Sequence, residues 1–294
     1  MHRIGVGHRN GPSRCRSRYG IAAALLFAWL GGCDGGLSHR SYAEGSGRFA
    51  VDEAVKVVRI EIANGTVQVD RSDAPEVTWA GGVRRGATTA EGLASLEQIV
   101  WQPTVVEGAP GSLLLRGPAP LEATSGDVLA LEIALRVPPT VELEIAVAGN
   151  GHVTVANRAA RTRVETGRGD LRFENCSGDL GGRTGRGYVI AFGHRGSLDV
   201  DTRAGDMQAF VEEPGALIRL VTGQGTVQCQ VPADASLDVD ARAEQGKIGN
   251  GFGLEVQRVG TYGAALVGKV GSARTKVVLR TGSGHLSIAP QRLR

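Results

Sequence analysis

Thr166-Gly-Arg-Gly169-Asp-Leu-Arg-Phe173 and Thr184-Gly-Arg-Gly187-Tyr-Val-Ile-Ala191 are two copies of the pattern that decides the fold of this chain. The second glycine of the pattern recurs at 151, 169, 187, 205, 225, 246 and 284, so most copies lie 18 to 21 residues apart. A fixed period of this length is typical of proteins that stack one structural unit on the next. Stacked units offer long repetitive faces, which suit binding or scaffolding better than a single catalytic pocket.

The residues that follow each glycine alternate between apolar and polar side chains. The second position after the glycine is apolar in every copy, and the fourth is apolar in six of seven. This alternation predicts a strand with one buried face, and the glycines permit a positive φ at the corner before it. A second, offset apolar set recurs once per period, which predicts a second strand; its first members are Leu180, Leu198, Ile218 and Leu237.

We therefore expect an all-β protein, with a two-faced parallel β-solenoid (β-helix-like) over residues 148–290 and strands about 4.8 Å apart. An antiparallel sandwich is the alternative, because its hairpin turns also recur at intervals of about eight to twelve residues. Residues 51–147 are less regular and are expected to form an N-terminal β region that caps the open end of the stack. Within this cap, residues 64–69 are an outlying copy of the repeat. Residues 87–99 are the only predicted helix, with Thr88 or Thr89 as its N-cap.

The first 32 residues have the features of a secretion signal. Five arginines and no acidic residue precede the apolar run 21–30, which is too short to span a bilayer as a helix. The run ends in Leu30-Gly-Gly-Cys33, which resembles the lipobox of bacterial lipoproteins. That resemblance implies that the signal is cut before Cys33 and that Cys33 is acylated. An ordinary signal peptide with an incidental cysteine is the alternative.

If Cys33 is acylated, its lipid chains would anchor the protein in a membrane of the bacterial cell envelope. We expect the chain to face the periplasm, and the sequence leaves open the inner membrane, the outer membrane and the cell surface. Asp34 resembles the residue that favours inner-membrane retention in enterobacterial lipoproteins. Residues 33–50 are rich in glycine, serine and polar residues and are predicted to be a flexible tether.

Charge and cysteine content exclude some classes of partner and bond. Removing the five arginines of residues 1–32 from 33 basic residues leaves 28 against 30 acids, a net charge of −2, so we expect no nucleic-acid binding. Cys176 and Cys229 are 53 residues apart, which corresponds to nearly three coils or roughly 14 Å along the stack. A disulfide requires Cα atoms within about 7 Å, so we expect none.

The pattern as a whole resembles the large bacterial family of putative adhesin domains with β-strand repeats, a domain of unknown function. The resemblance covers residues 50–290 and rests on three features: the Asn/Thr-Gly-x-Gly-x-Val-x-Val copies, the stretch Val137-Pro-Pro-x-Val-x-Leu143, and the closing Thr281-Gly-Ser-Gly-His-Leu-Ser-Ile288. It implies a secreted or lipid-anchored β-repeat protein and brings no catalytic residues with it.

The position directly after each repeat glycine forms a predicted outward column. Asp170 and Asp206 in this column would lie two coils apart, roughly 9.6 Å, with Tyr188 between them. This separation is too long for two carboxylates to share one metal ion, and we predict no catalytic site, metal or cofactor. The column is instead the candidate binding face; its members are His152, Asp170, Tyr188, Asp206, Thr226, Lys247 and His285.

The expected function is that of a lipid-anchored envelope protein whose solenoid binds, adheres or scaffolds without catalysis. The expected partners are the membrane, through Cys33, and an unknown envelope protein or glycan. A polysaccharide-active β-helix enzyme is the main alternative, and a concave groove with clustered carboxylates and exposed aromatic residues would favour it. A periplasmic sensor or assembly factor is a further alternative.

Overall fold

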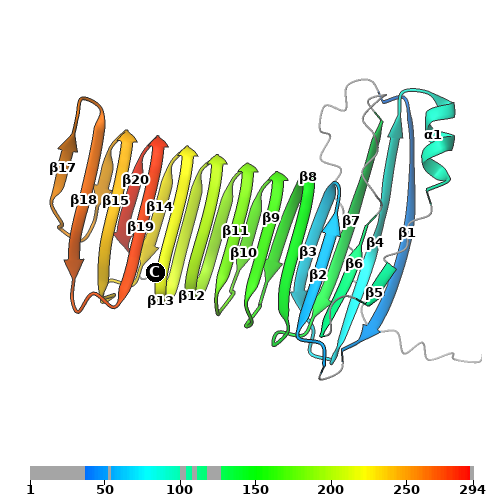
Figure 1. The fold of residues 1–294 in the computed structure, drawn as a ribbon, viewed down its shortest axis with the longest axis horizontal. Helices are drawn as coiled ribbons and strands as arrows, with labels where there is room; N and C mark the ends of the chain where they lie inside the picture. Colours follow the sequence, from blue (N-terminus) through cyan, green and yellow to red (C-terminus); the bar gives the residue numbers. More distant parts are fainter. Residues whose placement is uncertain (1–36, 52–53, 100–103, 108–110, 118–126, 292–294) are drawn as a thin grey trace, which may run out of the picture. The chain divides into compact units, whose positions relative to one another are not determined.

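The prediction of an all-β protein is confirmed by the computed structural model, in which the described residues form twenty strands and one short helix (Figure 1). The structure describes residues 37–51, 54–99, 104–107, 111–117 and 127–291. All of them belong to one structural unit, Gly36–Arg294. The predicted signal segment and Cys33 lie outside the described residues.

Successive repeats pair in parallel, in the register that the sequence predicts. Leu171 in β10 lies opposite Val153 in β8 on one side and Val189 in β12 on the other. Leu180 in β11 likewise lies between Thr162 in β9 and Leu198 in β12. The strands of this region are β8 (Glu142–Ala156), β9 (Thr162–Arg168), β10 (Leu171–Glu174), β11 (Leu180–Arg186), β12 (Val189–Ala204), β13 (Met207–Gln224) and β14 (Val227–Val231).

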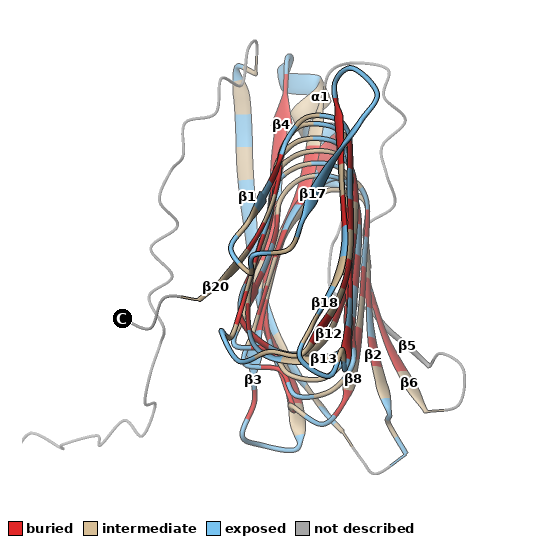
Figure 2. Ribbon diagram, turned by 90° about the vertical axis from the view of Figure 1, so that its left-hand side faces the viewer, coloured by how far each residue is buried: buried red, intermediate tan, exposed pale blue. Residues whose placement is uncertain are grey.

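Each period thus contributes one strand to each of two rows, which we call layer I and layer II. Layer I holds the segments that follow the repeat glycine, such as β10, and layer II holds those that precede it, such as β11. Buried residues alternate with less buried ones along the strands of both layers (Figure 2), so the buried ones share one face of each strand. Leu171 and Val189 are 1% and 2% exposed, whereas Arg172 between the two columns of buried residues is exposed. The predicted alternation is therefore confirmed at these positions.

The Thr-Gly-x-Gly sequences form the corner at which the chain passes from layer II to layer I, which we call the glycine corner. Gly169 has φ +132°, and a Cβ atom placed on it would lie 1.9 Å from the carbonyl oxygen of Gly151 in the neighbouring coil. The Thr184 hydroxyl donates a hydrogen bond to the Gly169 carbonyl oxygen at 3.0 Å. The repeat therefore keeps glycine because backbones meet closely there, and threonine because its hydroxyl bonds the adjacent coil.

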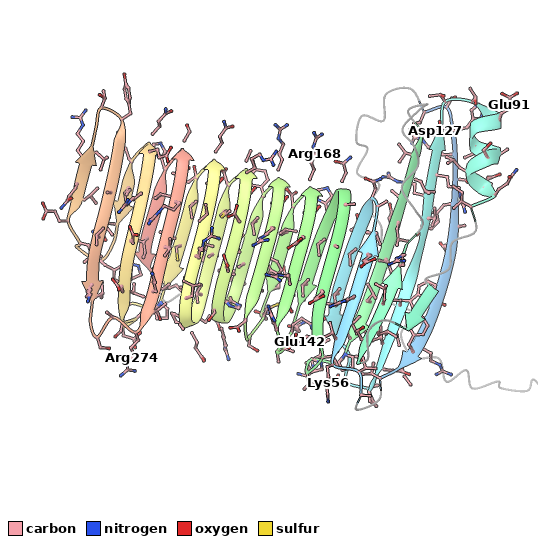
Figure 3. All side chains as sticks on the ribbon, in the orientation of Figure 1. Lys56, Glu91, Asp127, Glu142, Arg168 and Arg274 are labelled. Carbon is pink, nitrogen blue, oxygen red and sulfur yellow. The ribbon has the colours of Figure 1, made fainter. Side chains whose placement is uncertain are left out.

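The opposite corner, where the chain returns from layer I to layer II, has a pattern of its own. Asn157 and Asn175 adopt φ +56° and +50°, and Gly193 in the next coil adopts φ +66°. Asparagine and glycine are the residues that tolerate this left-handed conformation. We call this the asparagine corner. In Figure 3, Arg168 marks the glycine corner and Arg274 the opposite end of the strands.

The C-terminal strands do not stack in sequence order. Ile218 in β13 lies opposite Val277 in β19, and Val277 in turn lies opposite Val239 in β15, so the last repeat is inserted between two earlier ones. Residues 252–270, where the period breaks, form a hairpin that pairs antiparallel with β15. Since the hairpin covers the outer edge of β15, the following strand takes the inner edge. These strands are β15 (Leu237–Gln245), β16 (Ile248–Asn250), β17 (Val256–Val259), β18 (Gly263–Val270), β19 (Thr275–Ser283) and β20 (Leu286–Pro290).

The N-terminal region extends both layers. Gly65 lies opposite Gly151, and Val67 opposite Val153, so residues 64–69 are a copy of the repeat, as predicted. The strands are β1 (His39–Ala50), β2 (Val57–Ile62), β3 (Gly65–Arg71), β4 (Glu76–Ala87), β5 (Thr104–Glu107), β6 (Ser112–Arg116) and β7 (Val128–Val137). The helix α1 (Ala90–Glu97) begins after Thr89, whose hydroxyl accepts the Gly92 N–H.

One prediction needs correction in this region. Residues 39–50, assigned above to a flexible tether, form the edge strand β1, which pairs antiparallel with the whole of β4. Glycine and serine are common in this segment because Gly45 and Gly47 lie against the ring of Trp79, which is only 7% exposed. The polar composition therefore reflects an edge strand packed over a tryptophan.

Candidate functional site

The predicted outward column lies on the outer face of layer I, and four of its side chains accept a backbone N–H of a neighbouring coil. Asp170 Oδ1 accepts the Tyr188 N–H at 2.8 Å, and Asp206 Oδ1 accepts the Thr226 N–H at 2.7 Å. His285 Nδ1 accepts the Lys247 N–H at 3.2 Å. The column therefore joins several pairs of neighbouring coils, and its carboxylates are not gathered into one site. His152 continues the pattern, since its Nδ1 lies 3.4 Å from the Asp170 nitrogen.

Layer I also carries a group of apolar side chains on its outer face, of which Tyr188 and Phe192 are exposed and the other two half-buried. We call this group the aromatic patch: Tyr188, Ile190, Phe192 and Phe210. Tyr188 and Phe192 are 59% and 55% exposed. Tyr188 directly precedes β12 and Phe192 lies in it, and they alternate with the buried Val189 and Ala191, so they share the outer face. Phe210 in β13 lies opposite Phe192 in β12, and the two rings have centroids 5.6 Å apart and planes tilted by 55°. This is a favourable geometry for an aromatic pair.

The sequence analysis identified Tyr188 but missed the other three members of the patch. The available signal was the residue type at the third and fifth positions after each glycine. Other copies place Thr154, Arg172, Gln228 or Ser287 at the third position, where one copy has Ile190. An apolar residue at a position that points outward in every copy is informative, because the core does not require it.

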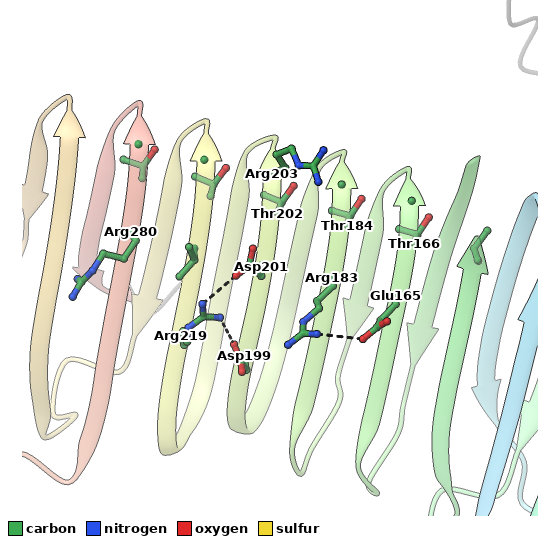
Figure 4. A pocket seen from close by; sticks show the side chains of 18 of the residues that line it. Glu165, Thr166, Arg183, Thr184, Asp199, Asp201, Thr202, Arg203, Arg219 and Arg280 are labelled. Atoms are coloured by element: carbon green, nitrogen blue, oxygen red, sulfur yellow. Dashed lines mark hydrogen bonds and ion pairs between the residues drawn. The ribbon is translucent and has the colours of Figure 1, made fainter. Parts of the chain in front are cut away.

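The outer face of layer II forms an open groove of about 1620 Å³. It is lined by charged side chains that are paired across strands (Figure 4). Arg219 contacts Asp199 at 2.7 Å and Asp201 at 3.0 Å, and Arg183 contacts Glu165 at 3.6 Å. Such opposite-charge pairs across strands stabilise a sheet modestly. No aromatic residue is among the described residues that line the groove.

The first glycine of several Thr-Gly-x-Gly copies lies at the edge of this groove. Gly167, Gly185, Gly223 and Gly282 line it in successive coils and carry no side chain. Arg203 replaces this glycine in one coil and stands at the glycine corner (Figure 4).

A second group of polar residues is buried at the asparagine corner, where Arg158, Cys176 and His194 occupy equivalent places in three successive coils. All three are at most 2% exposed. Arg158 donates to the carbonyl oxygens of Val137 and Pro138 at 2.6 Å each, so it ties the β7–β8 turn to the first coil. Burial lowers the pKa of the Arg158 guanidinium to about 10.

Burial also acts on the other two members of this group. It raises the pKa of the Cys176 thiol and lowers the pKa of the His194 imidazole. Cys229, in the interior of layer I, has its pKa raised to about 12 by burial. Both cysteines are free and buried. A buried thiol whose pKa is raised is a poor nucleophile, so we assign these residues to packing.

The described residues offer neither a metal-binding cluster nor a membrane-spanning helix. Among the described residues, no three His, Cys, Asp or Glu side chains lie close enough together to hold a metal ion. No helix within the described residues is both long and apolar enough to cross a membrane.

Comparison with known proteins found matches among solved structures alone: no protein-family model matches the chain, and neither does any curated protein. A putative cell adhesion protein from Clostridium sporogenes is 10% identical, with 85% of this chain and 100% of that chain covered and a TM-score of 0.37. A putative lipid binding protein from Parabacteroides distasonis is 12% identical, with 83% and 96% covered and a TM-score of 0.40.

A putative adhesin from Bacteroides fragilis is similar to the same degree. It is 10% identical, with 84% of this chain and 97% of that chain covered and a TM-score of 0.34. Similarity at this level does not carry a function from one protein to another, so the proposals below rest on the residues of this chain.

Proposed function

We propose that this chain is a lipid-anchored protein of the bacterial cell envelope, whose β-solenoid binds a partner through the aromatic patch without catalysis. The anchor is Cys33, and the support for it is the Leu30-Gly-Gly-Cys33 sequence after a short apolar run. The support for the solenoid is the parallel pairing of equivalent residues in successive repeats, such as Leu171 with Val189.

The observation that carries the binding proposal is the exposure of the aromatic patch. Tyr188 and Phe192 leave more than half of their surface in water on a face that otherwise presents polar residues such as Arg172 and Gln208. Clustered exposed apolar side chains mark interaction sites more often than isolated ones, and aromatic residues supply a large share of binding energy at interfaces. The partner that this surface fits is an envelope protein or a glycan that packs against the rings.

The competing proposal, a polysaccharide-active enzyme, has one observation in its favour: the groove on layer II is concave and contains carboxylates. However, Asp199 and Asp201 both bind the Arg219 guanidinium, and the exposed aromatic residues lie on the other layer. A general acid or a nucleophile must be free to act on the substrate. The arrangement therefore favours binding.

The proposal can be tested by photo-crosslinking in cells that produce the full chain. A photoreactive phenylalanine analogue at position 192 is expected to capture one partner, and the same analogue at position 188 should capture the same partner. Val267, which is 66% exposed on the outer side of β18, is the matched control position. Equal capture at 192 and 267, or no capture at 188 and 192, would contradict the proposal.

A further inference from the structure

Several arginines lie at the glycine corner without an ion pair to any acidic residue in the part of the chain that the structure describes. Arg168 and Arg186 occupy equivalent places in adjacent coils, and the Arg186 carbonyl oxygen accepts the Gly169 N–H at 2.7 Å. Arg203 stands at the same corner in the next coil. All three are exposed, and none makes an ion pair with an acidic residue that the structure describes. The backbones of Arg168 and Arg186 are thus about one coil apart, roughly 4.8 Å, whereas Arg203 occupies the place of the first glycine in its coil.

The acidic groups at this edge only partly oppose these arginines. Asp170 and Asp206 direct an oxygen to a backbone N–H of the next coil, and Glu244 is exposed three coils away from the arginines. Lys247 adds a positive charge near Glu244. Glu91 and Asp127 also lie at this edge but beside α1, away from the arginines (Figure 3).

An exposed aromatic residue lies further along the same edge. The hairpin of β17 and β18 turns at Val259–Gly263, where Tyr262 is 75% exposed and Val259 is 54% exposed. The Tyr262 carbonyl oxygen accepts the N–H of Gly246 at 2.9 Å. Because Gly246 is the repeat glycine of its coil, this bond places the hairpin turn at the glycine corner. Tyrosine is enriched where proteins meet the interface between lipid and water.

The beginning of β1 lies at the same edge, as the register across layer I shows. Stepping across the sheet from β1, Ala43 pairs with Val83 in β4, and Val83 pairs with Leu131 in β7. Leu131 pairs with Gly65 in β3, and Gly65 lies opposite the corner glycine Gly151 in β8. Residues before Ala43 therefore continue past the glycine corner. Leu37 is four residues after Cys33 in the sequence, and four residues span at most about 14 Å.

From these three placements we propose that the glycine-corner edge faces the membrane, where Arg168, Arg186 and Arg203 bind the phosphates of anionic phospholipid headgroups and Tyr262 enters the interface. The inference rests on the proposed anchor at Cys33. Its chemistry is that of guanidinium groups, which pair well with phosphate oxygens. In this orientation the strands stand upright on the membrane, and the aromatic patch on layer I remains accessible to a partner from the side.

The test uses the acylated full-length protein reconstituted into vesicles. One variant, S283C, places a fluorescent label at the glycine corner, and S272C places it in the turn before β19, at the opposite end of the strands; both serines are exposed. Cys176 and Cys229 are buried and should not react in the folded protein. We expect quencher lipids to quench the S283C label and leave the S272C label bright, in vesicles of phosphatidylcholine with about one third phosphatidylglycerol.

Charge variants then separate the arginines from the anchor. Replacing Arg168, Arg186 and Arg203 with glutamine should weaken docking of the edge by about fivefold per arginine. The control replaces Arg161, Arg163 and Arg274, which are also exposed but lie away from the glycine corner, and it should leave the quenching unchanged. Mass spectrometry of the same preparation reports whether Cys33 is acylated, so failure of the anchor and failure of the edge contact can be told apart.

Four outcomes would overturn the inference. The first is equal quenching of the S283C and S272C labels, and the second is an equal effect of the two triple variants. The third is quenching of S283C that is as strong in pure phosphatidylcholine as with phosphatidylglycerol. The fourth is that inorganic phosphate abolishes the quenching of the S283C label while chloride at the same ionic strength does not. That result would indicate a binding site for small anions.

Discussion

The two outer faces of the stacked coils come from the same repeat but differ in chemistry. On layer II, charged residues meet opposite charges in neighbouring strands, as Arg219 meets Asp199 and Asp201. On layer I, Phe192 and Phe210 pack against each other, with Phe192 exposed and Phe210 half-buried. The interior residues of the repeat therefore determine the fold. The residue types at outward positions determine which face carries side chains that are free to bind a partner.

The interior is shared, so core substitutions in either layer should be equally costly. Leu171→Ala in layer I and Leu198→Ala in layer II are each expected to lower the free energy of unfolding by about 2–5 kcal/mol, since both leucines are at most 1% exposed. Arg172→Ala, on the outer face, should change it by less than about 0.5 kcal/mol. Urea denaturation measures all three, and a similar loss at Arg172 and Leu171 would break the assignment of inner and outer residues.

The glycine corner joins the two layers and should be the next most sensitive place. Gly187 has φ +153°, and an added Cβ would lie 2.1 Å from the Gly169 carbonyl oxygen. Gly187→Ala is expected to cost about 1–3 kcal/mol, because backbone strain and close contact act together. The matched control is Gly181→Ala in β11, where the nearest atom would be 3.9 Å away. Thermal unfolding should separate the two variants; equal stability would mean that the corner is less tightly packed than described.

The asparagine corner should make stability depend on pH through His194. Burial lowers the pKa of this imidazole in the folded protein, so below pH about 6.5 the unfolded chain binds more protons than the folded one. The free energy of unfolding should therefore fall as the pH is lowered from about 6.5 towards the folded-state pKa, with a slope of at most about 1.4 kcal/mol per pH unit. Cys176 and Asp179 are the neighbouring titratable groups.

The variant His194→Gln should remove this part of the pH dependence. Denaturation midpoints at pH 7.5 and 5.5 measure the effect, and His152→Gln, on the exposed column, is the control. An unchanged pH slope in His194→Gln would show that another group is responsible.

The outer face of layer II should contribute least to stability. Arg219→Gln removes the contacts to Asp199 and Asp201, yet surface ion pairs are worth only about 0–1 kcal/mol each. We expect a loss of about 1 kcal/mol or less, reduced further in high salt. A loss as large as that of Leu171→Ala would mean that the charged face is part of the structural core.

Much of this architecture could be predicted from local sequence. The alternation after Gly169 and Gly187 predicts which residues are buried, and the constant period predicts their parallel register. The insertion of β19 between β13 and β15 could not be predicted, because it depends on which edge the β17–β18 hairpin covers. The same limit applies to β1, whose pairing partners in β4 lie 26 to 48 residues away in the sequence.

The candidate site could be predicted only in part. Tyr188 was found because it belongs to a regular column, whereas Phe192 and Phe210 stand at the fifth position after the glycine, where residue types vary from copy to copy, and were missed. The roles of Asp170 and Asp206 depend on bonds to the backbone of the next coil, and residue types do not reveal such bonds. Arg158, Cys176 and His194 are also spaced by one period. A residue at a corner can point into the core or into solvent, however, so the period alone does not predict that these three side chains are buried.

The most direct test of the central claim compares the two faces in one binding measurement. Once the partner captured at position 192 is identified, its affinity is measured for the double variant Phe192→Ser/Phe210→Ser and for the double variant Arg183→Gln/Arg219→Gln. We predict that the layer I variant loses about 30-fold or more in affinity, as expected for interface residues worth about 2 kcal/mol, and that the layer II variant changes by less than about twofold. Loss of affinity in the layer II variant, with the layer I variant unchanged, would contradict the account.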